Sequence, residues 1–157
     1  MMKQSITLYL VLLLAFVFVS SPVRAVESGG SDAVVTVIQG TARVYSKEST
    51  KGHVLKKGDR IKEDQEVRVS EKSRIELRFP DGTVMRLSEK SRLKMNDLAF
   101  NKKTESKNVE VDLAAGKLWA KVKKLTTPDS SVLVKTSNAV AGVRGTVYQV
   151  NVFEDMS

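Results

Sequence analysis

The sequence contains no cysteine and a single histidine, His53, and these two shortages exclude several kinds of protein. Without thiols the chain has no disulfide framework, no lipid anchor of the lipoprotein type and no zinc-thiolate site. One imidazole does not build a metal centre by itself, so we expect neither a metal nor a cofactor. The 157 residues are long enough for one hydrophobic core, which must hold the chain together by packing alone.

The common catalytic sequence patterns are also missing. The chain has no G-x-x-x-x-G-K phosphate loop, no nucleophile elbow around a serine and no D-x-[DN]-x-[DN]-G calcium loop. Two carboxylate pairs, Asp64 with Glu66 and Asp81 with Glu89, are candidates for hydrolytic chemistry, but acidic side chains are far more often solvated surface groups. The sequence therefore predicts a protein that is not an enzyme.

The one long apolar run lies at the N-terminus. Lys3 precedes the apolar residues 6–19, Pro22 ends the run, and Val23-Arg24-Ala25 supplies the small residues that signal peptidase reads. We interpret residues 1–25 as a secretory signal peptide cleaved after Ala25, which predicts a periplasmic or secreted protein without a stable membrane span. The alternative is a retained anchor, although the run is shorter than the ~20 residues that cross a bilayer.

The formal net charge is +8, and removal of the leader with Lys3 and Arg24 lowers it to +6. The basic residues alternate with acidic ones, and an exported protein rarely meets nucleic acid, so we expect no nucleic-acid partner. We interpret the charge as that of solvated strand faces. The alternative is attraction to an anionic envelope surface such as lipopolysaccharide, teichoic acid or phospholipid headgroups.

The rest of the chain predicts a flexible lead-in at 26–32 and one all-β domain at 33–157. Between residues 67 and 95 apolar side chains fall on one parity within each segment and charged ones on the other, which is typical of half-buried strands. Pro80-Asp81-Gly82-Thr83 predicts a tight turn between two of these strands. A hairpin is expected around Gly40, and a turn at Ala114-Ala115-Gly116.

One short segment occurs twice. Val69-Ser70-Glu71-Lys72-Ser73-Arg74-Ile75 returns as Leu87-Ser88-Glu89-Lys90-Ser91-Arg92-Leu93, eighteen residues later. Such a repeat is typical of stacked β-coils, each burying its apolar edge on the next. It is also compatible with two similar turns in a sandwich. Both architectures, an elongated roll or solenoid-like stack and a sandwich of short antiparallel strands and hairpins, stay open at this point.

Four segments in order resemble the motifs of the FecR-type domain, a family of bacterial extracytoplasmic all-β domains. They are Leu55-Lys56-Lys57-Gly58-Asp59-Arg60-Ile61, the segment from Arg74 to Thr83, Leu113-Ala114-Ala115-Gly116-Lys117-Leu118-Trp119, and Ala139-Val140-Ala141-Gly142-Val143-Arg144-Gly145-Thr146. Ser137 and Tyr148 stand where the family tends to have proline and phenylalanine. The resemblance favours the elongated roll.

In the regulators that name the family, the domain relays the occupancy of an outer-membrane receptor to a sigma factor inside the cell. Such a relay needs a cytoplasmic region and a transmembrane helix, which a cleaved leader does not supply. The resemblance therefore implies an exported interaction or scaffolding module whose partner is another envelope protein. The alternatives are a binder of envelope polymers and, if the leader is retained, a membrane-anchored signalling regulator. The oligomeric state is open.

Two groups of residues are the candidate sites. Gly142, Arg144, Gly145 and Thr146, together with Asp81 and Gly82, form the structural motif; we expect Arg144 either to point inward and bond carbonyls or to be solvated on a surface loop. Trp119 lies on the charged side of its strand with Lys117 and Lys121. These three residues are the candidate contacts for a partner protein or a glycan, unless the indole only covers the edge of the core.

Overall fold

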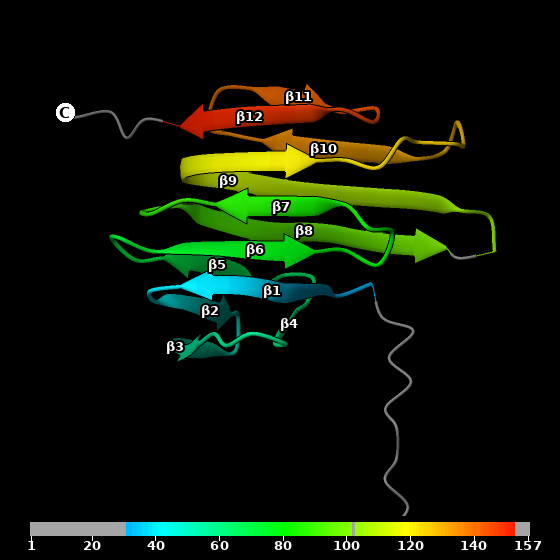
Figure 1. Ribbon diagram of the computed structural model, residues 1–157. Coiled ribbons are helices and arrows are strands. Elements are labelled where there is room, and N and C mark those ends of the chain that lie inside the picture. The colour runs from blue at the N-terminus through cyan, green and yellow to red at the C-terminus, as the bar shows by residue number, and fades with distance from the viewer. Residues whose placement is uncertain (1–30, 102, 153–157) are drawn as a thin grey trace, which may run out of the picture.

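The computed structural model describes residues 31–101 and 103–152, and every regular element in this part of the chain is a strand (Figure 1). The strands are β1 (Ala33–Gln39), β2 (Ala42–Ser46), β3 (Ser49–Val54), β4 (Arg60–Ile61), β5 (Glu66–Val69), β6 (Arg74–Arg78), β7 (Val84–Leu87), β8 (Arg92–Asn101), β9 (Ser106–Lys121), β10 (Ser131–Lys135), β11 (Val140–Gly142) and β12 (Val147–Val152). The all-β prediction is confirmed. The leader and most of the lead-in lie outside the described residues, and no helix that could cross a membrane is found within them.

The strands form one strongly curled sheet that is folded into two layers (Figure 1). The front layer has the order β4-β1-β6-β7-β9-β12, and the rear layer has the order β3-β2-β5-β8-β9-β10-β11. Neighbours are antiparallel except β9 and β10, which run parallel. The long strand β9 belongs to both layers, because it pairs with β8 and β10 before Gly116 and with β7 and β12 from Gly116 onward.

The hydrophobic core fills the space between the two layers. Its fully buried side chains come from the apolar parity of the alternating segments: Ile61, Ile75, Leu77, Met85, Leu87, Leu93, Met95, Leu113 and Leu118. The arginines of the other parity, such as Arg68, Arg74 and Arg86, are exposed. The predicted half-buried strands are thus confirmed, with period two placing apolar groups inside and charges outside.

The layers are joined along one side by a column of corners, and the sequence repeat forms two of them. Lys72 and Lys90 take the same positive φ, 52° and 58°. The serine after each lysine is buried and accepts a hydrogen bond from the adjacent corner: Ser73 Oγ from Thr41 N at 2.9 Å, and Ser91 Oγ from Lys117 N at 3.0 Å. The repeats are therefore equivalent turns at successive levels of an elongated roll.

Glycine forms the other two corners, and here two local predictions are wrong. β1 and β2 are not partners, because Gly40, at φ +77°, carries the chain from the front layer to the rear one. Gly116, at φ +89°, does not end its strand. β9 bends there and continues into the other layer, since a residue without Cβ can pass close to the neighbouring corner at Ser91.

Candidate functional site

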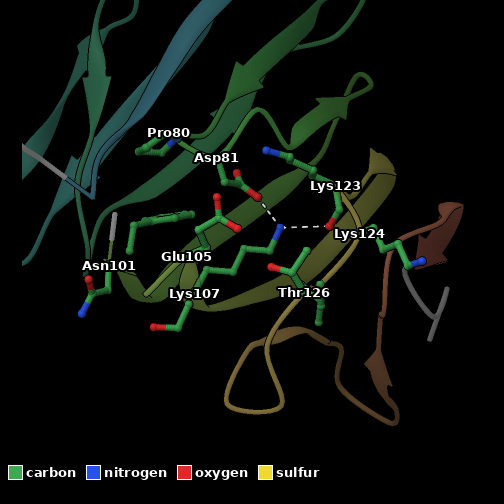
Figure 2. Close-up of a pocket in the computed structure, with 11 residues that line it drawn as sticks. Pro80, Asp81, Asn101, Glu105, Lys107, Lys123, Lys124 and Thr126 are labelled. Atoms are coloured by element: carbon green, nitrogen blue, oxygen red, sulfur yellow. Dashed lines mark hydrogen bonds and ion pairs between the residues drawn. The ribbon is translucent and has the colours of Figure 1, made fainter. Parts of the chain in front are cut away.

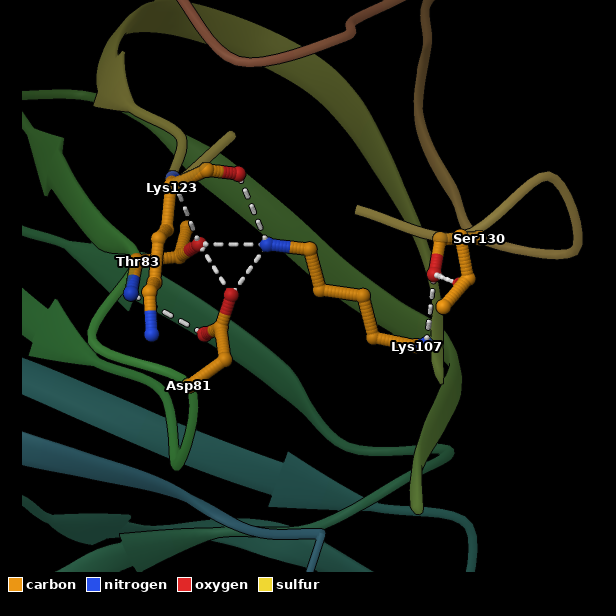
Figure 3. A network of polar contacts seen from close by, with 6 residues as sticks. Asp81, Thr83, Lys107, Lys123 and Ser130 are labelled. Carbon is orange, nitrogen blue, oxygen red and sulfur yellow. Dashed lines mark hydrogen bonds and ion pairs between the residues drawn. The ribbon is translucent and has the colours of Figure 1, made fainter. Parts of the chain in front are cut away.

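A buried ion pair lies on the side of the roll opposite the column of corners, and Figure 3 shows its contacts. The Lys107 side chain is only 5% exposed, and its ammonium contacts the Asp81 carboxylate. It also donates to Thr83 Oγ1 at 3.3 Å and to the Lys123 carbonyl at 3.1 Å. Asp81 in turn accepts from the Thr83 amide at 2.9 Å and from its hydroxyl at 2.7 Å. Three segments meet here: the β6–β7 turn, the start of β9 and the chain that follows β9.

This network is structural rather than reactive. An ammonium has three protons to donate, and Lys107 has three acceptors around it. The backbone amide of Lys107 is also satisfied, by Ser130 Oγ at 3.1 Å. We therefore assign Lys107 and Asp81 the task of tying the turn at Gly82 to β9.

The cavity beside this ion pair has a volume of about 200 Å³ (Figure 2). Pro80, Phe100 and Leu125 supply apolar wall, and Glu105 and Lys124 lie at its rim. Organic ligands usually occupy pockets of roughly 300–1,000 Å³. The cavity is smaller than this, and the ammonium at its side is already bonded to protein, so the geometry does not favour a substrate site here.

The outer face of the front layer carries Trp119 in a row of cross-strand neighbours. Registers between successive strands place Val37, Glu76, Arg86, Trp119 and Gln149 opposite one another, from β1 to β12. The Arg86 guanidinium lies over the indole ring, 4.6 Å from its centroid, and Arg86 Nε donates to Glu76 at 2.8 Å. Trp119 is half-buried. The guanidinium therefore covers one face of the indole, and the two groups form a stacked platform held by cation–π attraction and an ion pair.

Four exposed cations surround this row. Arg74 and Arg78 stand on β6, Lys117 and Lys121 stand on β9, and none of the four has an ion-pair partner among the described residues. The three sequence-predicted contact residues are therefore brought together on one face.

The outer face of the rear layer differs, because opposite charges are paired on it, such as Arg68 with Glu66 and Lys135 with Glu110. From β1 to β12 the front face carries Glu76 as its single carboxylate against five cations.

The Glu76 carboxylate sets the position of Arg86 and has a lowered pKa. The hydrogen bond from Arg86 is the main cause, and the one from Thr36 Oγ1 at 2.7 Å adds to it. A carboxyl whose folded pKa is lowered contributes stability above its unfolded pKa of about 4.3, and that stability is lost as the pH falls further.

We expect Glu76→Gln to reduce the loss of stability below about pH 4.3, because the variant has no proton to take up at this position. Urea unfolding at a series of pH values measures this change. Glu63→Gln is the control, since Glu63 is exposed and makes no ion pair with a described residue. An equal reduction in both variants would contradict the special role of Glu76.

The last strands leave one end of the curled sheet open. β12 pairs with β9 alone and β11 with β10 alone among the described residues. The Val122 amide donates to the Thr146 carbonyl, so alternation directs the backbone groups of Val147, Gln149 and Asn151 away from β9. The Tyr148 hydroxyl is buried without a partner there, and burial raises the pKa of Tyr148 to about 12.

The comparisons with known proteins fit this architecture. A protein-family model described as FecR protein matches residues 65–157, which covers β5 to β12. The chain belongs to the FecR family. No curated protein and no solved structure matches it. The segment from Leu55 to Ile61 lies before the matched range, so its likeness to a FecR motif stays a resemblance.

In the closing FecR motif, Arg144 lies on the surface, whereas Val143 and Gly145 pack closely against the rest of the domain. Arg144 is exposed and makes no hydrogen bond or ion pair with a described residue, so of its two expected positions it takes the one on the surface. Val143 enters the core instead. Gly145, at φ +77°, passes so close to the backbone of Lys124 that an added Cβ would lie 2.5 Å from Lys124 Cα. The structural work of this FecR motif therefore lies with Gly145 and Val143, and Arg144 joins the residues available for contact.

Sequence reasoning missed the buried ion pair of this FecR chain. No sequence motif singled out Lys107, which lies in the long hairpin that β8 and β9 form. Its side chain nevertheless points inward. The available signal was parity, because Lys107 falls in step with the buried residues Val109 and Val111. A lysine on the apolar parity of a strand calls for a buried partner, which Asp81 supplies.

Proposed function

We propose that this chain is a non-enzymatic, exported FecR module that contacts another envelope protein and takes part in envelope signalling. The family supports the setting, since FecR proteins are regulatory and signalling proteins associated with the cell envelope. The observation that carries the contact role is the open end of the sheet at β12. Unpaired backbone groups along an edge strand are a template for an added strand, the mode by which many domains capture extended partners.

The side chains at this end agree with a contact role. Val147 is 53% exposed and Val140 is 64% exposed, so apolar side chains are available to a partner at this end of the sheet. An added strand on β12 would cover the part of Tyr148 that is still exposed.

Photo-crosslinking in the native envelope tests the contact. We expect a photoreactive residue at Val147 or Gln149 to give adducts of defined mass with another envelope protein. The same residue at Arg43, which lies exposed on the rear layer, is the control and should give few adducts. If the photoreactive residue gave as many adducts at Arg43 as at Val147 or Gln149, the β12 edge would not be a specific contact site.

Export is tested separately on the mature protein. We expect mass spectrometry to find Val26 as the first residue and fractionation to recover the chain from the periplasm or the medium. An intact Met1 in the membrane fraction would instead favour the membrane-anchored regulator.

A further inference from the structure

We infer that the outer face of the front layer is a second binding site, for an acidic polysaccharide that lies across Trp119 between four cations. This inference goes beyond the proposed protein contact, which uses the β12 edge. The face has three properties that such a ligand needs: an aromatic platform, an excess of positive charge, and neutral hydrogen-bonding groups beside the charges. Each property comes from a separate observation.

The platform is the Arg86–Trp119 pair with the depression beside it. Val37, Glu76, Ser88 and Trp119 line this hollow together with Arg86, and its volume is about 460 Å³. Because the guanidinium covers one face of the indole, a pyranose ring would pack on the exposed Arg86 plane and on the edge of the indole, while its hydroxyls bond to polar groups at the margin. The hollow is large enough to take one such ring beside the stacked pair.

The cations form the corners of a rectangle around the platform. Arg74 and Arg78 are four residues apart on β6, as are Lys117 and Lys121 on β9, and strand geometry makes this separation about 13 Å. β7 lies between β6 and β9, so the two pairs are about 10 Å apart. Glu76 is already bonded to Arg86 and Thr36. Arg78 also attracts the Glu76 carboxylate, but this one carboxylate faces five cations among the described residues of this face, so an anionic ligand is the complement.

Neutral polar groups beside the charges favour a glycan over other anions. The amide side chains of Gln39, Gln149 and Asn151 are exposed on the strands that flank the four cations, and the hydroxyl of Ser88 is exposed at the end of β7. These groups both donate and accept hydrogen bonds, as sugar hydroxyls require. A phospholipid surface would need an apolar group that enters the membrane, and the one large ring on this face is half-buried and stacked. An acidic polysaccharide uses the charges, the amides and the ring together.

Trp119 is the sole tryptophan of the chain, so its emission reports on this face directly. We expect polygalacturonate to change the Trp119 emission in a saturable titration and neutral dextran to have no effect. Lys117→Gln combined with Lys121→Gln should weaken the apparent affinity at least ~10-fold, and salt should weaken it as well. The matched control is Lys57→Gln combined with Lys62→Gln, which removes the same charge from exposed loop positions and should change the affinity less than ~2-fold.

A second variant tests the ring itself. Trp119→Ala should abolish retention on immobilised polygalacturonate while the far-UV spectrum and the melting transition stay cooperative. The inference is overturned if polygalacturonate leaves the emission unchanged, or if both lysine pairs matter equally. It is also overturned if polyglutamate or phosphatidylglycerol vesicles bind as tightly as the polysaccharide, since charge alone would then explain the binding. None of these results bears on crosslinking from Val147, so the two proposals fail independently.

Discussion

Lys107→Met is expected to lower the free energy of unfolding by about 3–5 kcal/mol, the usual cost of removing one partner from a buried ion pair. Methionine fills a similar volume, so the effect comes from the groups left behind. The Asp81 carboxylate is 15% exposed and would lose its counter-charge, and the carbonyl of Lys123 would lose its donor. Urea unfolding at neutral pH, followed by circular dichroism, measures the change.

Two further variants separate this network from the general effect of losing a lysine. Lys123→Met removes an exposed side chain that lines the same cavity, and it should change stability by less than about 0.5 kcal/mol. Lys107→Met combined with Asp81→Asn should recover part of the loss, because the uncompensated charge is then absent. A fully additive double variant would show that the two residues do not act as a pair.

Gly116→Ala is expected to cost about 2–5 kcal/mol, the sum of a left-handed backbone penalty and of overpacking. Gly116 has φ +89°, and a Cβ at this position would lie 2.3 Å from Ser91 Oγ and 2.5 Å from Ser91 Cα. The hydroxyl could rotate away, but the backbone carbon could not. The measurement is again urea unfolding, with the hydrogen exchange of the Ser91 corner as a local probe.

Gly82→Ala is the matched control for this corner. Gly82 has nearly the same φ, +88°, yet nothing lies within 4 Å of the position its Cβ would take. It should therefore show only the backbone penalty of about 1–2 kcal/mol. If the two variants were equally unstable, the close approach of the corners at Gly116 and Ser91 would contribute nothing.

The fold class could be predicted because period-two alternation is a local property. Ile75, Leu77, Met85 and Leu87 are buried as their parity requires, and the same rule placed Trp119 outside with Lys117 and Lys121. The route of the chain between layers could not be predicted in this way. Gly40 and Gly116 both suggested turns, and only the close packing of neighbouring corners shows that they carry the strand across the roll instead.

The composition of the candidate site depended on pairings between distant strands. Arg86 lies over Trp119 because β7 and β9 are neighbours in register, and these residues are far apart in the chain. Lys107 and Asp81 meet for a similar reason, on the side of the roll opposite the column of corners. A pattern within one strand shows which way a side chain points, but it does not show what lies opposite. The closing motif is a second example. Its two glycines are compatible with an inward-pointing Arg144, but Arg144 is exposed and the neighbouring Val143 enters the core.

The dual membership of β9 has a consequence for how this protein is made. One strand closes both layers, and it ends at Lys121, late in the order of synthesis. Before β9 is synthesised, the strands of the two layers have no partner in common, and loop-closure entropy opposes the packing of one layer on the other. Folding of this domain therefore depends on contacts between residues far apart in the sequence, and the two layers close only when β9 pairs with both.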